Sequence, residues 1–162
     1  MLARIRRIRV PLFAALISAG LAVATQGSQP LFYINLTASM PLGIYVSTGG
    51  HIKSGDIVVF PASSLPPFPH HNPLPPRLLK RAIFRDGSTF SIASDGLHFD
   101  SRLIAARWHD TPGLLLPPRA LPAGAFIALG DHPQSLDSRY FGPVPLSSAR
   151  PVRLLLFFGA HT

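Results

Sequence analysis

The stretch Asn35–Tyr45, with the sequence NLTASMPLGIY, places a serine between small residues, just before a Met-Pro step and a glycine. Pro41 fixes its own backbone φ angle, and Gly43 tolerates φ values that other residues avoid. Proline and glycine in this arrangement are typical of a turn. An apolar run, Ile44–Val46, follows directly. The stretch therefore predicts a turn that presents Ser39 and leads into a β-strand.

The composition indicates one small domain rich in turns. The chain has 162 residues and is 47% hydrophobic, which is enough for a core. Its 18 prolines and 13 glycines disfavour long helices. The absence of cysteine excludes a disulfide framework, a thiolate zinc site and a cysteine nucleophile. The seven histidines show no metal-ligand spacing, so we expect no metal site.

The formal net charge is +8, from 15 basic and 7 acidic residues. Such an excess can indicate a nucleic-acid partner. However, four of the arginines (Arg4, Arg6, Arg7 and Arg9) cluster before the apolar segment, and the other basic residues are scattered. We therefore expect no nucleic-acid partner.

The N-terminus combines this basic region with an apolar run, Val10–Ala24. One interpretation is an uncleaved signal-anchor helix, oriented by its arginines and occupying residues 1–29. The other is a signal peptide cleaved after Ala24, because Ala22-Val23-Ala24 has the small-x-small form of a cleavage site. Both interpretations send the domain of residues 30–162 across the inner membrane.

The remaining chain reads as short strands separated by turns. Ile57–Phe60 is a strong buried strand, and Asp95-Gly96 is a good hairpin signal between two runs. Further strands are expected at Leu31–Ile34, Leu78–Phe84, Phe90–Ala93, Leu97–Phe99, Ile104–Trp108, Ala125–Leu129 and Val152–Phe158, and loops at Pro61–Pro76 and Thr111–Pro122. The fold class predicted is all-β, mostly antiparallel, with a small inserted β sub-domain at about residues 86–122 and one N-terminal membrane helix.

Two residues have the chemistry of a serine nucleophile and its base. A serine hydroxyl needs a base, and a lysine serves only when its pKa falls well below about 10.4. Burial lowers a lysine pKa, and Lys80 lies in the apolar Leu78–Phe84 run. Taken singly, Lys80 is better interpreted as an outward-facing strand lysine, and Ser39 as an ordinary turn serine.

A third stretch, Gly130–Pro143, favours the catalytic interpretation. It carries many polar groups after an apolar strand, and such a loop needs internal hydrogen bonds and ion pairs to hold its shape. Ser135 is short enough to orient a neutral lysine amine. Asp131 is placed to pair with Arg81, and Asp137 and Arg139 pair either with each other or with other members of the site. Together the three stretches predict a Ser-Lys hydrolase.

The same three stretches resemble the conserved boxes of the type I signal peptidases, and most closely the conjugative-transfer TraF branch. The resemblance runs from about Leu31 to Pro151. The third box is the most specific of the three. The matching residues are Asn35, Thr37, Ser39, Met40, Pro41, Gly43 and Tyr45, then Leu79, Lys80 and Arg81, then Gly130–Pro133, Ser135 and Asp137–Pro145.

The resemblance implies a serine endopeptidase on a signal-peptidase-like β fold, anchored in the bacterial inner membrane with its catalytic domain in the periplasm. Ser39 is then the nucleophile, and Lys80 the general base. The Ser39 backbone N–H and the Thr37 hydroxyl hold the oxyanion. Ser135 orients Lys80, while Arg81, Asp131, Asp137 and Arg139 support the site. No cofactor is needed.

The implied substrate is an exported precursor, the pilin of a conjugative or type IV secretion system, with other transfer components as possible partners. Hydrolysis and cyclising transpeptidation both fit, and the oligomeric state is open. One alternative is a general type I signal peptidase that removes leader peptides. Another is a non-enzymatic, membrane-anchored assembly subunit, whose expected signature is a missing serine or lysine.

Overall fold

The computed structural model describes residues 30–70, 73–108 and 111–159. The chain divides into two compact units, Met1–Leu31 and Phe32–Thr162, and the described strands lie in the second. The predicted signal-anchor helix falls on residues 1–29, outside the described residues. Within the described ranges, no helix is long and apolar enough to cross a membrane.

The larger sheet has seven strands in the order β1-β2-β11-β3-β4-β9-β10, and each neighbouring pair is antiparallel. The predicted mostly antiparallel β class is therefore confirmed. In chain order the strands are β1 (Phe32–Asn35), β2 (Leu42–Ser47), β3 (Ile57–Pro61), β4 (Arg77–Ile83), β9 (Ala125–Leu129), β10 (Val144–Pro145) and β11 (Arg150–Gly159).

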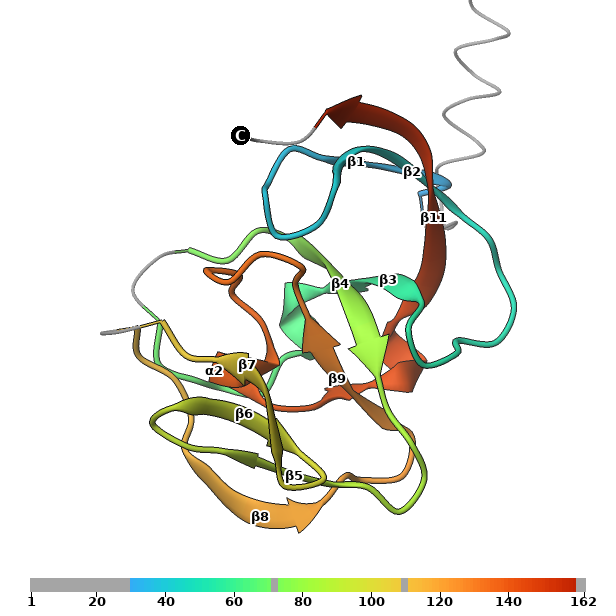
Figure 1. The fold of residues 1–162 in the computed structure, drawn as a ribbon. Coiled ribbons are helices and arrows are strands. Elements are labelled where there is room, and N and C mark those ends of the chain that lie inside the picture. Colours follow the sequence, from blue (N-terminus) through green and yellow to red (C-terminus); the bar gives the residue numbers. More distant parts are fainter. Residues whose placement is uncertain (1–29, 71–72, 109–110, 160–162) are drawn as a thin grey trace, which may run out of the picture. The chain divides into compact units, whose positions relative to one another are not determined.

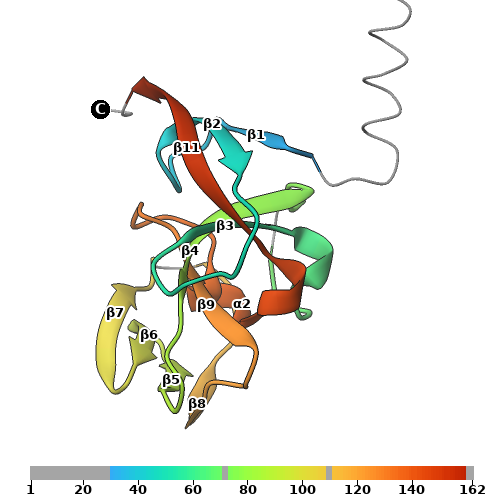
Figure 2. The ribbon, with the colours of Figure 1, turned by 90° about the vertical axis from the view of Figure 1, so that its right-hand side faces the viewer.

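The second sheet has four strands in the order β7-β6-β5-β8. They are β5 (Thr89–Ile92), β6 (Gly96–Phe99), β7 (Arg102–Ala106) and β8 (Leu116–Ala120). The hairpin predicted around Asp95-Gly96 is present, with Ile92 paired to Leu97. In Figures 1 and 2 these strands lie at one end of the Phe32–Thr162 unit, and β1, β2 and the end of β11 lie at the other.

Strand β8 corrects one expectation, because the sequence predicts a loop over Thr111–Pro122. Pro117 and Pro118 lack the N–H that a ladder needs, which is why the stretch reads as a loop. However, β8 is an edge strand that pairs only with β5, so a missing donor can face outward. The β5–β8 register is irregular between Phe90 and Ile92.

The helices of the described chain are short. The one-turn helix α2 (Ser138–Phe141), which the sequence does not predict, begins after Asp137, whose side chain accepts a hydrogen bond from the Arg139 N–H. Gly142 ends it with a positive φ of 82°. Two 3₁₀ turns, η1 (Ala62–Ser64) and η2 (Leu146–Ser148), follow β3 and β10.

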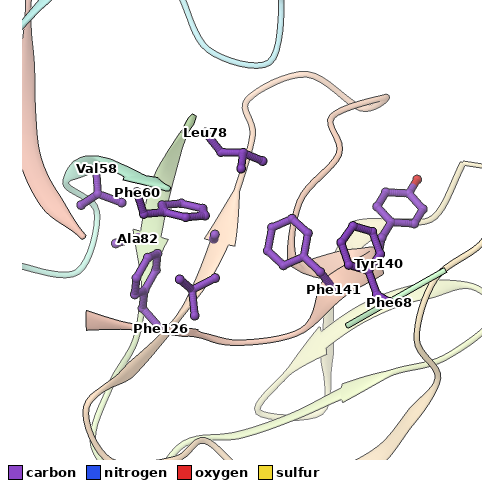
Figure 3. Close-up of a cluster of buried hydrophobic side chains, with 10 residues drawn as sticks. Val58, Phe60, Phe68, Leu78, Ala82, Phe126, Tyr140 and Phe141 are labelled. Atoms are coloured by element: carbon purple, nitrogen blue, oxygen red, sulfur yellow. The ribbon is translucent and has the colours of Figure 1, made fainter. Parts of the chain in front are cut away.

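The main core lies between the seven-stranded sheet and α2. Phe60 of β3 and Phe126 of β9 meet edge to face, with ring centroids 5.7 Å apart. Phe141 of α2 makes a similar contact with Phe68. Figure 3 shows these rings as two neighbouring groups, with Val58 and Ala82 beside the first and Tyr140 beside the second. This packing holds β4 and the start of α2 in place, and both carry predicted site residues.

Candidate active site

The predicted nucleophile, Ser39, lies in the turn between β1 and β2. Met40 is 1% exposed and anchors this turn in the interior. The Tyr45 hydroxyl of β2 donates a hydrogen bond to the Pro41 carbonyl at 2.7 Å. The Thr37 and Ser39 hydroxyl oxygens are 3.1 Å apart, so these two predicted site residues are hydrogen-bonded. The turn is thus tied down on both sides of the serine.

Asn35 is a further residue that holds this turn, and its function was not predicted from the sequence. It ends β1 and is 7% exposed. Its amide nitrogen donates to the carbonyls of Thr37, Met40 and Pro41, at 2.9, 2.9 and 3.1 Å. These acceptors are backbone groups, which sequence patterns do not reveal.

The predicted base, Lys80, points into the protein. Strand β4 alternates between buried and partly exposed residues, and Lys80 lies on the buried face with Leu78 and Ala82. The side chain is 3% exposed. Burial lowers the pKa of Lys80 from 10.5 to about 8, while Asp137 acts against this shift, Arg139 adds to it, and Asp131 opposes it again. The interpretation as an outward-facing strand lysine is therefore wrong.

The loop after β9 is organised by a buried ion pair, as the sequence predicted. The Asp137 and Arg139 side chains are 0% and 3% exposed, and their closest N–O distance is 2.7 Å. The Arg139 guanidinium also donates to backbone carbonyls of the loop, those of His132, Pro133 and Ser135. The same Asp137 oxygen, Oδ2, also accepts a hydrogen bond from the Gly130 N–H, at 3.0 Å. The pair thus ties both ends of the loop together.

Gly130 is the point at which two of the stretches meet. A Cβ built on Gly130 would lie 2.0 Å from the Ser135 hydroxyl oxygen and 2.9 Å from the Ser39 carbonyl oxygen. The next N–H, of Asp131, donates to the same Ser39 carbonyl at 2.7 Å. Only glycine permits such an approach, so this residue brings the nucleophile turn against the third stretch.

Strand β4 is joined to the loop after β9 through Arg81, the neighbour of Lys80. The Arg81 guanidinium forms a two-pronged ion pair with the Asp131 carboxylate, at 2.9 and 3.1 Å. This predicted pair is therefore present. It is partly exposed, since the two side chains keep 37% and 41% of their surface. It raises the pKa of Arg81 chiefly through the hydrogen bond to Asp131.

Ser135 is buried beside Gly130, and its hydroxyl oxygen has no hydrogen-bond partner among the described residues. A buried, unpaired hydroxyl is uncommon in a folded protein, and among the described residues the Tyr33 hydroxyl is in the same position. Among the hydrogen bonds of the described residues, none joins Lys80 to Ser39 or to Ser135. The structure thus brings together the Ser39 turn, strand β4 and the loop after β9. The hydrogen bonds that would join the nucleophile, the base and Ser135 in a reacting complex are not formed among these residues.

No group of three or more histidine, cysteine, aspartate or glutamate side chains in the described ranges is placed to hold a metal ion. The polar groups of the three stretches instead comprise the Asp137–Arg139 and Arg81–Asp131 ion pairs, the buried Lys80 amine and the unpaired Ser135 hydroxyl. A buried lysine of lowered pKa and a fixed serine turn, joined to the same loop, suit acyl transfer.

A model of the family described as signal peptidase, peptidase S26, matches residues 7–151, which include all three stretches. The chain belongs to this family. It is therefore a serine-type signal peptidase, a peptide-bond hydrolase that acts on exported precursor proteins.

Among solved structures, the chain is similar to the crystal structure of a signal peptidase I from Enterococcus faecalis. The sequence identity is 23%, the TM-score is 0.40, and the match covers 64% of this chain and 97% of the other. A search of the curated proteins finds no match.

Proposed function

We propose that this signal peptidase uses Ser39 as its nucleophile and Lys80 as its general base. The observation that carries this proposal is the burial of Lys80 on the inner face of β4, in a site where Gly130 and Asp131 contact the Ser39 turn. With a pKa of about 8, about one Lys80 amine in ten is neutral at pH 7. A lysine of ordinary pKa is neutral in fewer than roughly one molecule in a thousand.

The reaction then follows from the residues. The neutral Lys80 amine takes the Ser39 proton as the hydroxyl oxygen attacks the peptide carbonyl, and it returns that proton to the leaving amine. The Ser39 N–H, which has no acceptor among the described residues, and the Thr37 hydroxyl donate to the oxyanion. The unpaired Ser135 hydroxyl accepts from or donates to Lys80 and orients it. Water or an amine then releases the acyl group.

The proposed supporting residues act through the loop and not on the substrate. Asp137 and Arg139 keep the loop closed around Gly130, and Asp131 keeps Arg81, and hence β4, in register with it. Their charges also adjust the Lys80 pKa, since Asp137 and Asp131 raise it and Arg139 lowers it.

We also propose that the enzyme is anchored in the inner membrane by residues 1–29 and works in the periplasm, with residues 30–162 as the catalytic domain and residues 86–122 as an inserted sub-domain. The exposed apolar side chains on β1 and β11 support a position beside the membrane. They include Phe32, Ile34, Leu155, Leu156, Phe157 and Phe158, each 48–67% exposed.

The proposed substrate is the pilin precursor of a conjugative or type IV secretion system. The His132-Pro133 step favours the TraF branch, and it is the sequence support for this choice. Cleavage alone and cleavage with cyclisation of the pilin use the same acyl-enzyme, and differ only in whether water or an amine attacks it.

The test is co-expression of the wild-type chain or Ser39→Ala with the pilin-like precursor of the same gene neighbourhood, followed by intact mass of the product. A shortened product that depends on Ser39 is expected, and loss of one further water identifies cyclisation. Rescue of a strain depleted of its general signal peptidase would instead show the general enzyme. A wild-type chain that neither cleaves the precursor nor reacts with an acylating inhibitor would support the non-enzymatic assembly subunit.

A further inference from the structure

Asn35 has an orientation that its neighbours determine. Its amide nitrogen faces three backbone carbonyls, and its amide oxygen faces the Thr37 N–H at 3.3 Å. Turning the amide over would bring oxygen against three acceptors and a nitrogen against a donor. The oxygen Oδ1 is therefore the atom that meets Thr37.

This orientation decides where two hydroxyl hydrogens point. The Thr37 hydroxyl lies 2.8 Å from Asn35 Oδ1, which can only accept, so Thr37 donates its one hydrogen there. The Thr37 oxygen is also 3.1 Å from the Ser39 oxygen. Because the Thr37 hydrogen is already used, Ser39 must be the donor in that second contact.

In the free enzyme, two successive hydrogen bonds therefore run from the Ser39 hydroxyl to Thr37 and from the Thr37 hydroxyl to Asn35. In this arrangement the Ser39 hydrogen points at Thr37 and is not offered to Lys80. Reaction requires the Ser39 hydroxyl to turn toward the amine, and the Thr37 hydrogen to turn from Asn35 toward the oxyanion. Both are rotations about a C–O bond, and no covalent bond breaks in either.

We propose that Asn35 is a positioning residue of the peptidase, which sets the direction of the Thr37 hydroxyl and through it the resting direction of the Ser39 hydroxyl. The inference rests on the proposed roles of Ser39, Lys80 and Thr37. Asn35 touches no reacting atom. Its contact with Thr37 acts on the rate at which the acyl-enzyme forms, while its contacts with the three carbonyls hold the turn.

The probe is a β-lactam-type acylating inhibitor, and the readout is the rate at which the full-length chain gains the inhibitor mass at Ser39. A double-mutant cycle separates the two contributions of Asn35. Thr37→Val removes the hydroxyl, and we expect a loss of about 10²- to 10³-fold in acylation rate, as for other oxyanion donors. Asn35→Ala removes the turn contacts and also the acceptor that holds the Thr37 side chain in place for the oxyanion, and is expected to cost on the order of 10- to 100-fold in total.

In the double variant Asn35→Ala/Thr37→Val, the loss is expected to be smaller than the product of the two single losses. The part of the Asn35 effect that acts through the Thr37 hydroxyl is already gone, and only the part that holds the turn remains. Losses that multiply would overturn the inference, since they would mean that Asn35 only supports the turn. Thr37→Ser keeps the hydroxyl and should keep the full dependence on Asn35.

Two further variants keep the test valid. Asn35→Asp retains an oxygen that meets Thr37 but loses the donors to the three carbonyls, so its rate loss reports the turn alone and should multiply with that of Thr37→Val. All rates are compared at a temperature at which the melting curve shows each variant to be folded. Thr48→Val is the matched control, since Thr48 Oγ1 donates only to the Pro151 carbonyl at 3.3 Å, and its acylation rate should equal that of the wild type.

The proposed function fails in a different way. If the wild-type chain and Ser39→Ala are equally unlabelled, and neither processes a precursor, then the Ser39 assignment is wrong and the inference falls with it. Labelling of the wild type together with multiplying losses overturns the inference alone.

Discussion

The site contains two aspartate–arginine pairs that differ in their exposure to water. Asp137–Arg139 is almost completely buried, whereas Arg81 and Asp131 keep 37% and 41% of their side-chain surface. A buried pair is costly to break, because the remaining partner stays charged without water. An exposed pair contributes only about 0–1 kcal/mol. The first pair is therefore a structural requirement, and the second mainly adjusts the site.

The largest expected effect is that of breaking the buried pair. Asp137→Asn leaves the Arg139 guanidinium buried without a counter-charge, and should lower the free energy of unfolding by about 3–5 kcal/mol. The measurement is the urea midpoint of the wild type and variant at pH 7. Asp131→Asn, the same change in the exposed pair, is the matched control. Equal midpoint shifts in the two variants would remove the distinction between the pairs.

The next effect is that of Lys80, whose pKa responds to charges of both pairs. The folded pKa of Lys80, about 8, is below its ordinary 10.5, so the unfolded chain binds more protons between these pH values. The contribution of Lys80 to the free energy of unfolding therefore falls by about 3 kcal/mol in total as the pH drops from about 10.5 to 8, and it stays low below pH 8.

Lys80→Met should remove this penalty, abolish acylation and raise stability at pH 7 by up to about 3 kcal/mol. The gain should shrink above pH 8 and vanish above about 10.5. Urea unfolding of both proteins at pH 7 and at pH 10.5 tests this. A gain in stability that is independent of pH would mean that the pKa of Lys80 is not lowered in the folded protein. In the wild type, the acylation rate should rise with pH through about 8.

A smaller effect is expected at Gly130, the residue before Asp131. Gly130→Ala places a methyl group against the Ser135 side chain, and should cost about 1–3 kcal/mol. Acylation should fall as the Ser39 turn and the loop are pushed apart. Thermal unfolding gives the stability change. Adding Ser135→Gly removes the two closest atoms but leaves the Ser39 carbonyl oxygen 2.9 Å from the new methyl group, so part of the lost stability should return. If it does not, the contact is not the cause.

The smallest effect is that of Asp131→Asn on stability, about 0–1 kcal/mol. Its informative consequence is on pH dependence, since both aspartates raise the Lys80 pKa, and Asp137 does so more strongly. The midpoint of the acylation pH profile should therefore move to lower pH in Asp131→Asn. A midpoint that moves upward would contradict the placement of this carboxylate near the amine.

Much of the strand pattern was accessible from the sequence, because apolar runs and the Asp95-Gly96 turn are local signals. The direction of Lys80 was not, since Lys80 and Arg81 are adjacent in an apolar run and either can face inward. The burial pattern of β4 decides in favour of Lys80. The sequence did suggest the Asp137–Arg139 and Arg81–Asp131 pairs, which are present.

The features that the sequence did not reveal depend on backbone contacts or on position within a sheet. Asn35 acts on carbonyl groups, which every residue possesses. The close approach at Gly130 depends on two segments far apart in the chain. Strand β8 contains two prolines that only an edge position tolerates. The assignment of catalytic roles stays a prediction, for which the experiments above are designed.

The hydrogen bond from the Asp131 N–H to the Ser39 carbonyl joins residues that are distant in sequence. Closing a contact across so long a segment costs chain entropy, so this hydrogen bond depends on the rest of the fold. In the unfolded chain Lys80 is solvated and has its ordinary pKa, so the proposed nucleophile Ser39 has no base. Completion of folding is therefore the step that creates the proposed active site.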